Sequence, residues 1–346
     1  MEKIGSKETI WLFIILILSR VTLDAVSVFV YNSGTAAAIN SICGLIIAGI
    51  AVLITNIAFK NNDIKDVFLS VYGKKLQMAL GAVLFVVTIL NASRRMTMFS
   101  DAIGEFVLQT SPKVFILGIF AICIFFTSFI GIEALSRFSY LAGIGIALFI
   151  GIIVASSSVE VRVENIYPVL GKGRALNVFN MLYVFSDIMY FYLIGSSVTN
   201  RNKHVELGIV IKSGIIISFI AFFYALCVPY PVSEKFVYPI YRLASLANTS
   251  VLIQRLDGLV FLIWIFAGFV SVGALTIFAT EIFRSSFKLS DRRGVLPVIT
   301  FVIFLVSLTG GGNFKFLDSI LSVFAFAVFP ITSVIYKIKH RRHKSA

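Results

Sequence analysis

Three charged residues lie deep inside stretches of the chain that are otherwise apolar: Arg20, Asp24 and Asp187. A charge in membrane hydrocarbon costs at least about 2.5 kcal/mol, so such residues normally face the interior of a helix bundle and a partner there. Arg20 and Asp24 are four residues apart and share one helix face, which predicts a buried ion pair. Because a carboxylate in a dry site can also carry a proton or contact a ligand, a functional role for Asp24 and Asp187 is the alternative.

The motifs of common catalytic sites are missing from the sequence. It contains no G-x-x-x-x-G-K-[ST], no H-E-x-x-H and no G-x-S-x-G. The three histidines, His204, His340 and His343, fall in a connecting segment and in the basic tail, away from the apolar stretches. We therefore expect neither enzyme activity nor a cofactor or metal site.

Long apolar stretches must position the buried charges. Ten segments reach the length of about 18 apolar-dominated residues that a helix needs to cross a bilayer. They cover residues 10–30, 35–59, 76–107, 114–132, 138–157, 175–198, 206–229, 257–282, 294–309 and 316–336. With 58% hydrophobic and 14% charged residues, the composition excludes an ordinary soluble domain. The sequence predicts an all-α integral membrane protein with one membrane domain over residues 1–346.

Lys and Arg are unevenly distributed over the connections between these stretches. With a cytosolic N-terminus, about 18 of the 30 basic residues lie inside and about 8 outside. This positive-inside bias predicts that both termini are cytosolic. The tail from Lys337 to Lys344 is interpreted as an orientation signal beside anionic lipid head groups, and we expect no nucleic-acid partner because no aromatic platform accompanies the charges.

The rise of a helix places the three buried charges at similar depths. At about 1.5 Å per residue, Arg20 lies roughly 14 Å and Asp24 roughly 20 Å beyond Trp11, and Asp187 lies roughly 17 Å beyond Leu176. All three fall in the middle third of a hydrocarbon core of about 30 Å. A midplane cluster from the first and sixth spans is the layout expected of a five-plus-five inverted-repeat, transporter-like fold.

The third stretch, residues 76–107, is longer than a bilayer core and must tilt or protrude. Arg94, Arg95, Asp101 and Glu105 are expected in its outer third. They form either a solvated external end with local ion pairs or the lining of an external vestibule.

Short motifs recur at the ends of the predicted spans. A proline-led segment, Tyr238-Pro239-Ile240-Tyr241-Arg242, precedes Gln254-Arg255-Leu256-Asp257, which opens a stretch containing Trp264. Further motifs are Tyr72-Gly73-Lys74, Thr110-Ser111-Pro112, Gly131-Ile132-Glu133 and Tyr167-Pro168-Val169. Along essentially the whole chain these motifs follow one another as they do in the endospore germination permeases, and the sequence resembles that family. These are the B subunits of spore nutrient germinant receptors, within the amino acid–polyamine–organocation superfamily.

The resemblance implies a receptor subunit in the spore inner membrane that binds a small nutrient, such as an amino acid, and triggers germination. It implies an A-type membrane subunit and a C-type lipoprotein subunit as partners, and a central pocket formed by spans 1, 3, 6 and 8. Combined with midplane depth, it singles out the ligand-binding candidates Thr22, Asp24, Thr88, Ile89, Asp187, Met189 and Ser271. The alternative function is a proton-coupled secondary transporter of amino acids or amines, with Asp24 or Asp187 as the proton carrier.

The first span departs from the family pattern. The family usually has a glycine-containing, unwound stretch there, whereas this chain reads Val21-Thr22-Leu23-Asp24-Ala25-Val26. Side chains such as Thr22 and Asp24 are therefore expected to replace the backbone groups that an unwound helix exposes. An assembly subunit without a working pocket is a third function that this departure leaves open.

Overall fold

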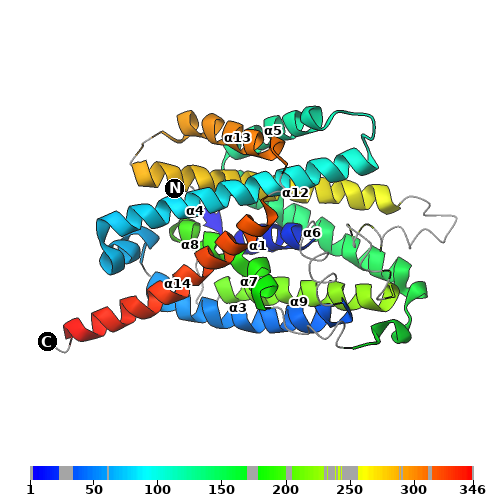
Figure 1. Cartoon of the computed structure of the whole chain (residues 1–346), viewed down its shortest axis with the longest axis horizontal. Coiled ribbons are helices and arrows are strands. Elements are labelled where there is room, and N and C mark those ends of the chain that lie inside the picture. The colour runs from blue at the N-terminus through cyan, green and yellow to red at the C-terminus, as the bar shows by residue number, and fades with distance from the viewer. Residues whose placement is uncertain are drawn as a thin grey trace.

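The computed structural model describes residues 3–22, 34–60, 62–169, 178–199, 205–229, 256–287, 291–310 and 314–344, together with residues 232, 238, 241, 243 and 289. Its helices, labelled in Figure 1, are α1 (Ser6–Arg20), α3 (Ala37–Phe59), α4 (Ile64–Phe106), α5 (Lys113–Ile130), α6 (Ile132–Ser157), α7 (Val178–Phe185), α8 (Phe191–Ile194), α9 (Val205–Cys227), α12 (Leu256–Phe287), α13 (Arg292–Leu308) and α14 (Lys315–Lys344). Two short strands, β1 (Ile4–Gly5) and β2 (Val198–Thr199), pair in parallel. Each predicted stretch overlaps at least one of these helices, so the prediction of an all-α fold is confirmed.

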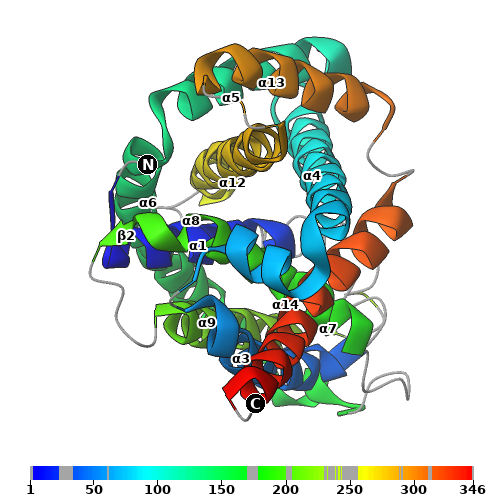
Figure 2. The ribbon, with the colours of Figure 1, turned by 90° about the vertical axis from the view of Figure 1, so that its left-hand side faces the viewer.

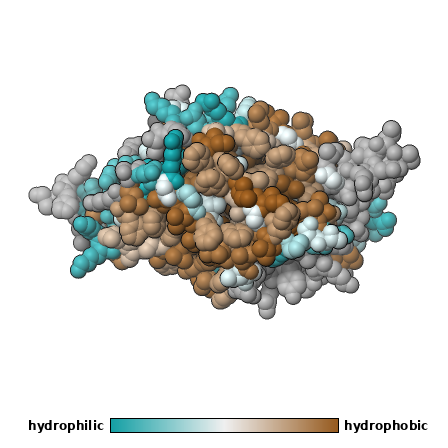
Figure 3. Space-filling model, turned by 90° about the horizontal axis from the view of Figure 1, so that it is seen from above, coloured by the Kyte–Doolittle hydropathy of each residue, from teal (hydrophilic) through white to brown (hydrophobic). Residues whose placement is uncertain are grey.

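Apolar outer faces mark this fold as a membrane protein. Within the described residues, seven helices are long and apolar enough to cross a bilayer: α3, α4, α5, α6, α9, α12 and α14. On α3, Ile42, Ile46 and Ile50 are 49%, 56% and 53% exposed and follow one another at helical spacing. Figure 3 shows a broad hydrophobic belt across the middle of one face, with hydrophilic residues mainly toward the ends. Such a surface is stable in contact with lipid rather than water.

Helix α1 lies in the centre of the bundle. Seen along the bundle in Figure 2, α4, α5, α12 and α13 lie on one side of it and α3, α9 and α14 on the other. Its apolar residues run around the whole circumference, and Leu12, Phe13, Ile15 and Leu16 are fully buried. A helix that is hydrophobic all round is expected at such a buried position. Arg20 at its last turn is thereby carried into the interior.

The sixth predicted span is broken in the middle. Helix α7 ends at Phe185, residues Ser186–Tyr190 form a 3-10 turn, and α8 starts at Phe191. Irregular backbone at membrane depth is tolerated only where the protein satisfies its carbonyl groups. Here the carbonyl of Tyr183 accepts a hydrogen bond of 2.6 Å from Nη1 of Arg20. The break presents Asp187, which is fully buried, to the neighbouring helices.

Gly73 divides α4 into a short and a long helix. Its φ of 76° and ψ of 171° lie in a region that glycine adopts without strain, and they separate Ile64–Tyr72 from the long helix that follows. The sequence predicts a short amphipathic helix within residues 61–75 with Ile64, Val67, Phe68 and Val71 on one side, and this helix is present. Val67 and Phe68 are buried, and the ring of Phe68 lies 5.7 Å from those of Phe59 and Phe329.

Candidate ligand cavity and buried charge cluster

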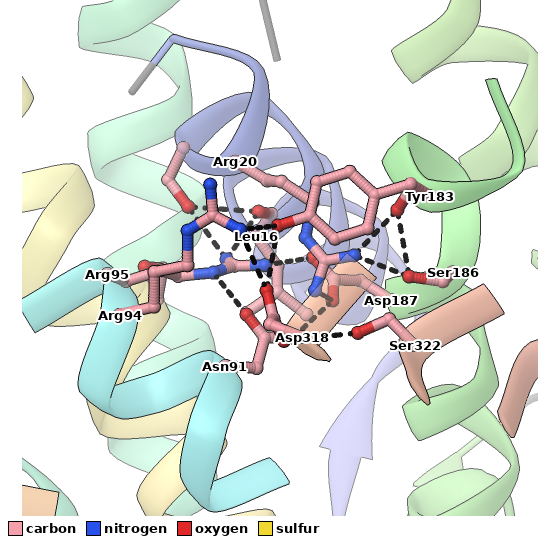
Figure 4. A network of polar contacts seen from close by, with 12 residues as sticks. Leu16, Arg20, Asn91, Arg94, Arg95, Tyr183, Ser186, Asp187, Asp318 and Ser322 are labelled. Atoms are coloured by element: carbon pink, nitrogen blue, oxygen red, sulfur yellow. Dashed lines mark hydrogen bonds and ion pairs between the residues drawn. The ribbon is translucent and has the colours of Figure 1, made fainter. Parts of the chain in front are cut away.

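Five charged side chains from four elements meet inside the bundle (Figure 4). They are Arg20 of α1, Arg94 and Arg95 of α4, Asp187 of the 3-10 turn and Asp318 of α14, and none is more than 4% exposed. We call these five residues the charge cluster. Among the described residues, three guanidinium groups face two carboxylates, which leaves one positive charge in excess in this cluster. Burying so many charges is costly unless each is paired and hydrogen-bonded.

Asp187 is the centre of the charge cluster. Its Oδ1 lies 2.9 Å from Nη2 of Arg20 and accepts a hydrogen bond of 3.1 Å from Nδ2 of Asn91. Its Oδ2 forms an ion pair with Nη2 of Arg95. Two cations and an amide thus compensate one carboxylate that has lost its water, as a buried charge requires.

Arg95 connects three elements through one planar group. Its Nε donates to Oδ1 of Asn91 at 2.9 Å, while Nη1 donates to the carbonyl of Leu16 at 2.8 Å and to Oγ of Ser19 at 2.9 Å. With Nη2 on Asp187, the guanidinium joins α4 to α1 and to the break in the sixth span. The fixed fork of an arginine holds such partners in one relative orientation.

The second ion pair lies on the α14 side of the cluster. Nη1 of Arg94 is 3.3 Å from Oδ2 of Asp318, which also accepts a hydrogen bond of 2.8 Å from the hydroxyl of Tyr183. The guanidinium of Arg20 lies 4.4 Å from the centre of the Tyr183 ring, a favourable cation–π contact. Tyr183 therefore joins the two halves of the cluster.

An apolar cavity of about 80 Å³ adjoins the cluster between α1, α6, α9 and α12. Its walls include Ile15, Leu18, Ile146, Phe149, Ile150, Ile153, Phe223, Ile263 and Ala267. The polar groups in the lining are the hydroxyls of Ser19 and Thr22 and the indole of Trp264, whose Nε1 donates to Oγ1 of Thr22 at 2.9 Å. An apolar site with a few polar groups at one side is the usual composition of a small-molecule site.

Ser19 belongs to both features. Its side chain lines the cavity, and its Oγ accepts the hydrogen bond from Arg95 while donating to the carbonyl of Leu16 at 2.9 Å. Ser19 therefore links the cavity to the charge cluster through a single hydrogen bond.

The predicted ligand-binding residues do not all meet at one cavity. Thr22 lines the apolar cavity, and Asp187 lies in the charge cluster. Four others are buried by the protein and are absent from the lining of that cavity: Thr88, Ile89, Met189 and Ser271. The hydroxyls of Thr88 and Ser271 donate to carbonyls of their own helices, at 2.6 and 3.5 Å.

Asp24 lies outside the described residues. Arg20, its predicted partner, contacts Asp187 instead of standing alone. The pairing of Arg20 with Asp24 therefore stays a prediction, and so does the role of Asp24 in ligand binding.

The prediction that Arg94 and Arg95 lie at a solvated outer end or line an external vestibule is wrong. They are 4% and 3% exposed and contact Asp318 and Asp187, at the level of the broken span. The prediction fails because position along the stretch does not show which turns are covered by neighbouring helices, and in the fold those helices bury both arginines. Further along, Asp101 does form a local surface pair, 2.5 Å from Lys113.

Sequence reasoning missed Asp318 of the charge cluster and the neutral partners Asn91 and Tyr183, which hydrogen-bond to it. For the part of the cluster on α4, the available signal was the pair Arg94 and Arg95 in an apolar stretch, one helical turn after Asn91. Tyr183 and Asp318 carry no such signal because an aromatic in a span and an acid near a span end are both common.

The bundle and its internal charges define a helical integral membrane protein. A family model described as spore germination protein matches residues 3–311, so the chain belongs to the spore germination permease family. This is a family of membrane permeases and not of enzymes. No match was found among curated proteins.

Proposed function

We propose that this chain is the membrane subunit of a spore nutrient germinant receptor, which binds a small nutrient and triggers germination. In this proposal it works in the spore inner membrane beside an A-type membrane subunit and a C-type lipoprotein subunit. It has ten spans, a five-plus-five inverted-repeat arrangement and both termini in the cytosol. The family membership supports a role in germination, and the cavity beside Thr22 provides a place for the nutrient.

The observation that carries the proposal is the position of Ser19 between cavity and charge cluster. A nutrient that displaces the side chain of Ser19 disturbs the hydrogen bond that its Oγ accepts from Nη1 of Arg95. Arg95 in turn holds Asp187 in the broken sixth span and the carbonyl of Leu16 in α1. Binding is thereby coupled to the packing of α1, α4 and the break, which is the kind of bistable contact that a ligand can shift.

Filling the cavity tests this proposal. We expect Ala267→Leu to weaken the nutrient response at least about tenfold, equivalent to about 1.4 kcal/mol, because Ala267 lines the cavity and a larger side chain competes with the ligand. The measurement is the nutrient concentration for half-maximal germination of spores, with protein abundance measured in the same membranes. Ala147→Leu is the matched control, since Ala147 is exposed on α6, which also lines the cavity. An unchanged dose–response curve for Ala267→Leu at normal abundance contradicts the site.

A second candidate is a proton-coupled transporter of amino acids or amines. It is favoured by the buried carboxylate of Asp187 in a broken span, a common place for ion coupling in transporters. Proteoliposomes separate the two functions. A transporter should take up labelled nutrient against its gradient when a proton gradient is applied, whereas a receptor should bind the nutrient without accumulating it.

Both termini are expected to face the cytosol. In a chain with Cys43, Cys123 and Cys227 replaced by Ala, Ser345→Cys should resist a membrane-impermeant maleimide in intact cells and react after permeabilisation. Thr110→Cys, in the external connection after α4, should react in intact cells and serves as the positive control. Strong labelling at position 345 in intact cells would contradict this orientation.

A further inference from the structure

A second cavity, of about 360 Å³, is lined by elements at the end of the bundle that faces the viewer in Figure 2. It lies between the Ile64–Tyr72 helix, the first turns of the long part of α4, α8 and the last turns of α12. Its polar lining consists of Lys65, Lys74, Gln77, Ser285 and Ser286. No aspartate or glutamate is among the described residues that line it, so its two ammonium groups give it a positive charge.

The rest of this cavity is apolar and reaches the outer surface of the bundle. Phe68, Leu84 and Ile282 form buried parts of the wall, at 4%, 7% and 3% exposure. Leu69 and Met78 also line it, yet they are 47% and 54% exposed on the outside of the bundle. The cavity therefore joins a cationic, hydroxyl-bearing part to an exposed apolar rim.

The shape of the cavity is held by contacts of the short helix. Gly73 provides the turn that folds this helix back, and Phe68 anchors it among aromatic rings. Nε2 of Gln77 donates to the carbonyl of Lys65 at 3.2 Å, and Nζ of Lys339 donates to the carbonyl of Ser70 at 2.6 Å. These contacts hold the short helix beside the start of the long part of α4 and the end of α14, and both Lys65 and Lys74 line the cavity between them.

We propose that this cavity binds an anionic phospholipid. The phosphate lies between the ammonium groups of Lys65 and Lys74, where the hydroxyls of Ser285 and Ser286 can rotate to donate to it. Both hydroxyls now donate to the carbonyl of Ile282 at 2.9 Å, so each can exchange that bond for a stronger one to a charged oxygen. An acyl chain then follows Leu69 and Met78 into the bilayer. Basic pockets between membrane helices are a general means of holding such head groups.

The apolar rim distinguishes a lipid from free phosphate as the source of the anion. A soluble anion uses only the cationic part and gains nothing from Leu69 and Met78, whereas a lipid uses both. The site is separate from the apolar cavity proposed for the nutrient, so the two proposals can fail independently. A bound lipid would hold the short helix against α12.

Native mass spectrometry of the purified full chain tests the proposal, with phosphatidylglycerol as the probe. Lys65→Gln with Lys74→Gln should weaken its binding about 25-fold, taking about fivefold for each lysine near an anionic group. Lys75→Gln with Lys337→Gln removes the same charge from exposed lysines outside the lining and should change binding less than about twofold. All four lysines are exposed, so neither double variant removes a packed group.

Phosphatidylcholine and inorganic phosphate are two further probes, which identify the source of the anion. Leu69→Gln with Met78→Gln should weaken the binding of phosphatidylglycerol while leaving any binding of inorganic phosphate unchanged. The proposal is overturned if both lysine pairs have the same effect, if phosphatidylcholine binds as tightly as phosphatidylglycerol, or if inorganic phosphate alone binds as tightly as the lipid.

Discussion

Replacement of Asp187 by Asn is expected to remove most of the folded protein from the membrane. Arg20 and Arg95 both contact this carboxylate, and they would remain buried without it. Removing one partner of a buried ion pair costs about 3–5 kcal/mol, which is more than about a hundredfold in the ratio of folded to unfolded protein. The measurement is abundance and monodispersity of the solubilised protein, by quantitative immunoblot and size-exclusion chromatography.

A surface pair supplies the control for this substitution. Asp101 lies 2.5 Å from Lys113, and both side chains are 45% exposed, so Asp101→Asn should cost at most about 1 kcal/mol. Equal abundance of the Asp187→Asn and Asp101→Asn proteins contradicts the charge cluster. Asp24→Asn in the same assay examines the predicted pairing with Arg20, and a loss of abundance supports it.

The Arg94–Asp318 pair should show strong coupling between its two charges. Asp318→Asn keeps an acceptor for the hydroxyl of Tyr183 but raises the excess charge of the cluster by one, so we expect a loss of about 3 kcal/mol. Adding Arg94→Met restores the original net charge and should recover most of that loss. Abundance of the single and double variants measures the coupling.

The double variant also reports on the role of the pair. If abundance recovers and the nutrient response is lost, the pair transmits the signal. If both recover, it is a structural element. Additive losses from the two substitutions contradict the proposed coupling.

The helices and the depths of Arg20 and Asp187 were predictable from sequence. Apolar length identified stretches that overlap α3, α5, α6 and α9. The rise per residue put Arg20 and Asp187 at similar depth, where they contact one another. These features depend on local composition and on a regular helix, and both can be read from a single chain.

The partners within the cluster were not predictable in the same way. Spacing of four residues favours a pair between Arg20 and Asp24, whereas the contact of Arg20 with Asp187 joins residues 167 positions apart. Arg94 and Arg95 were assigned to an outer end because rise alone gives neither the tilt of α4 nor the place where it leaves the bilayer. The apolar cavity had no signal, because Ile15, Ile146 and Ala267 resemble any other residues of a span.

Equilibrium binding of the germinant to the purified chain tests the central claim most directly. The germinant is first identified by comparing spores with and without this chain across amino acids and sugars. We predict saturable binding to the wild-type and Ala147→Leu proteins, and a loss of at least about tenfold in affinity for Ala267→Leu. Absence of saturable binding to folded wild-type protein, or equal affinity of all three proteins, would contradict the claim that this chain binds the nutrient in the cavity beside Thr22.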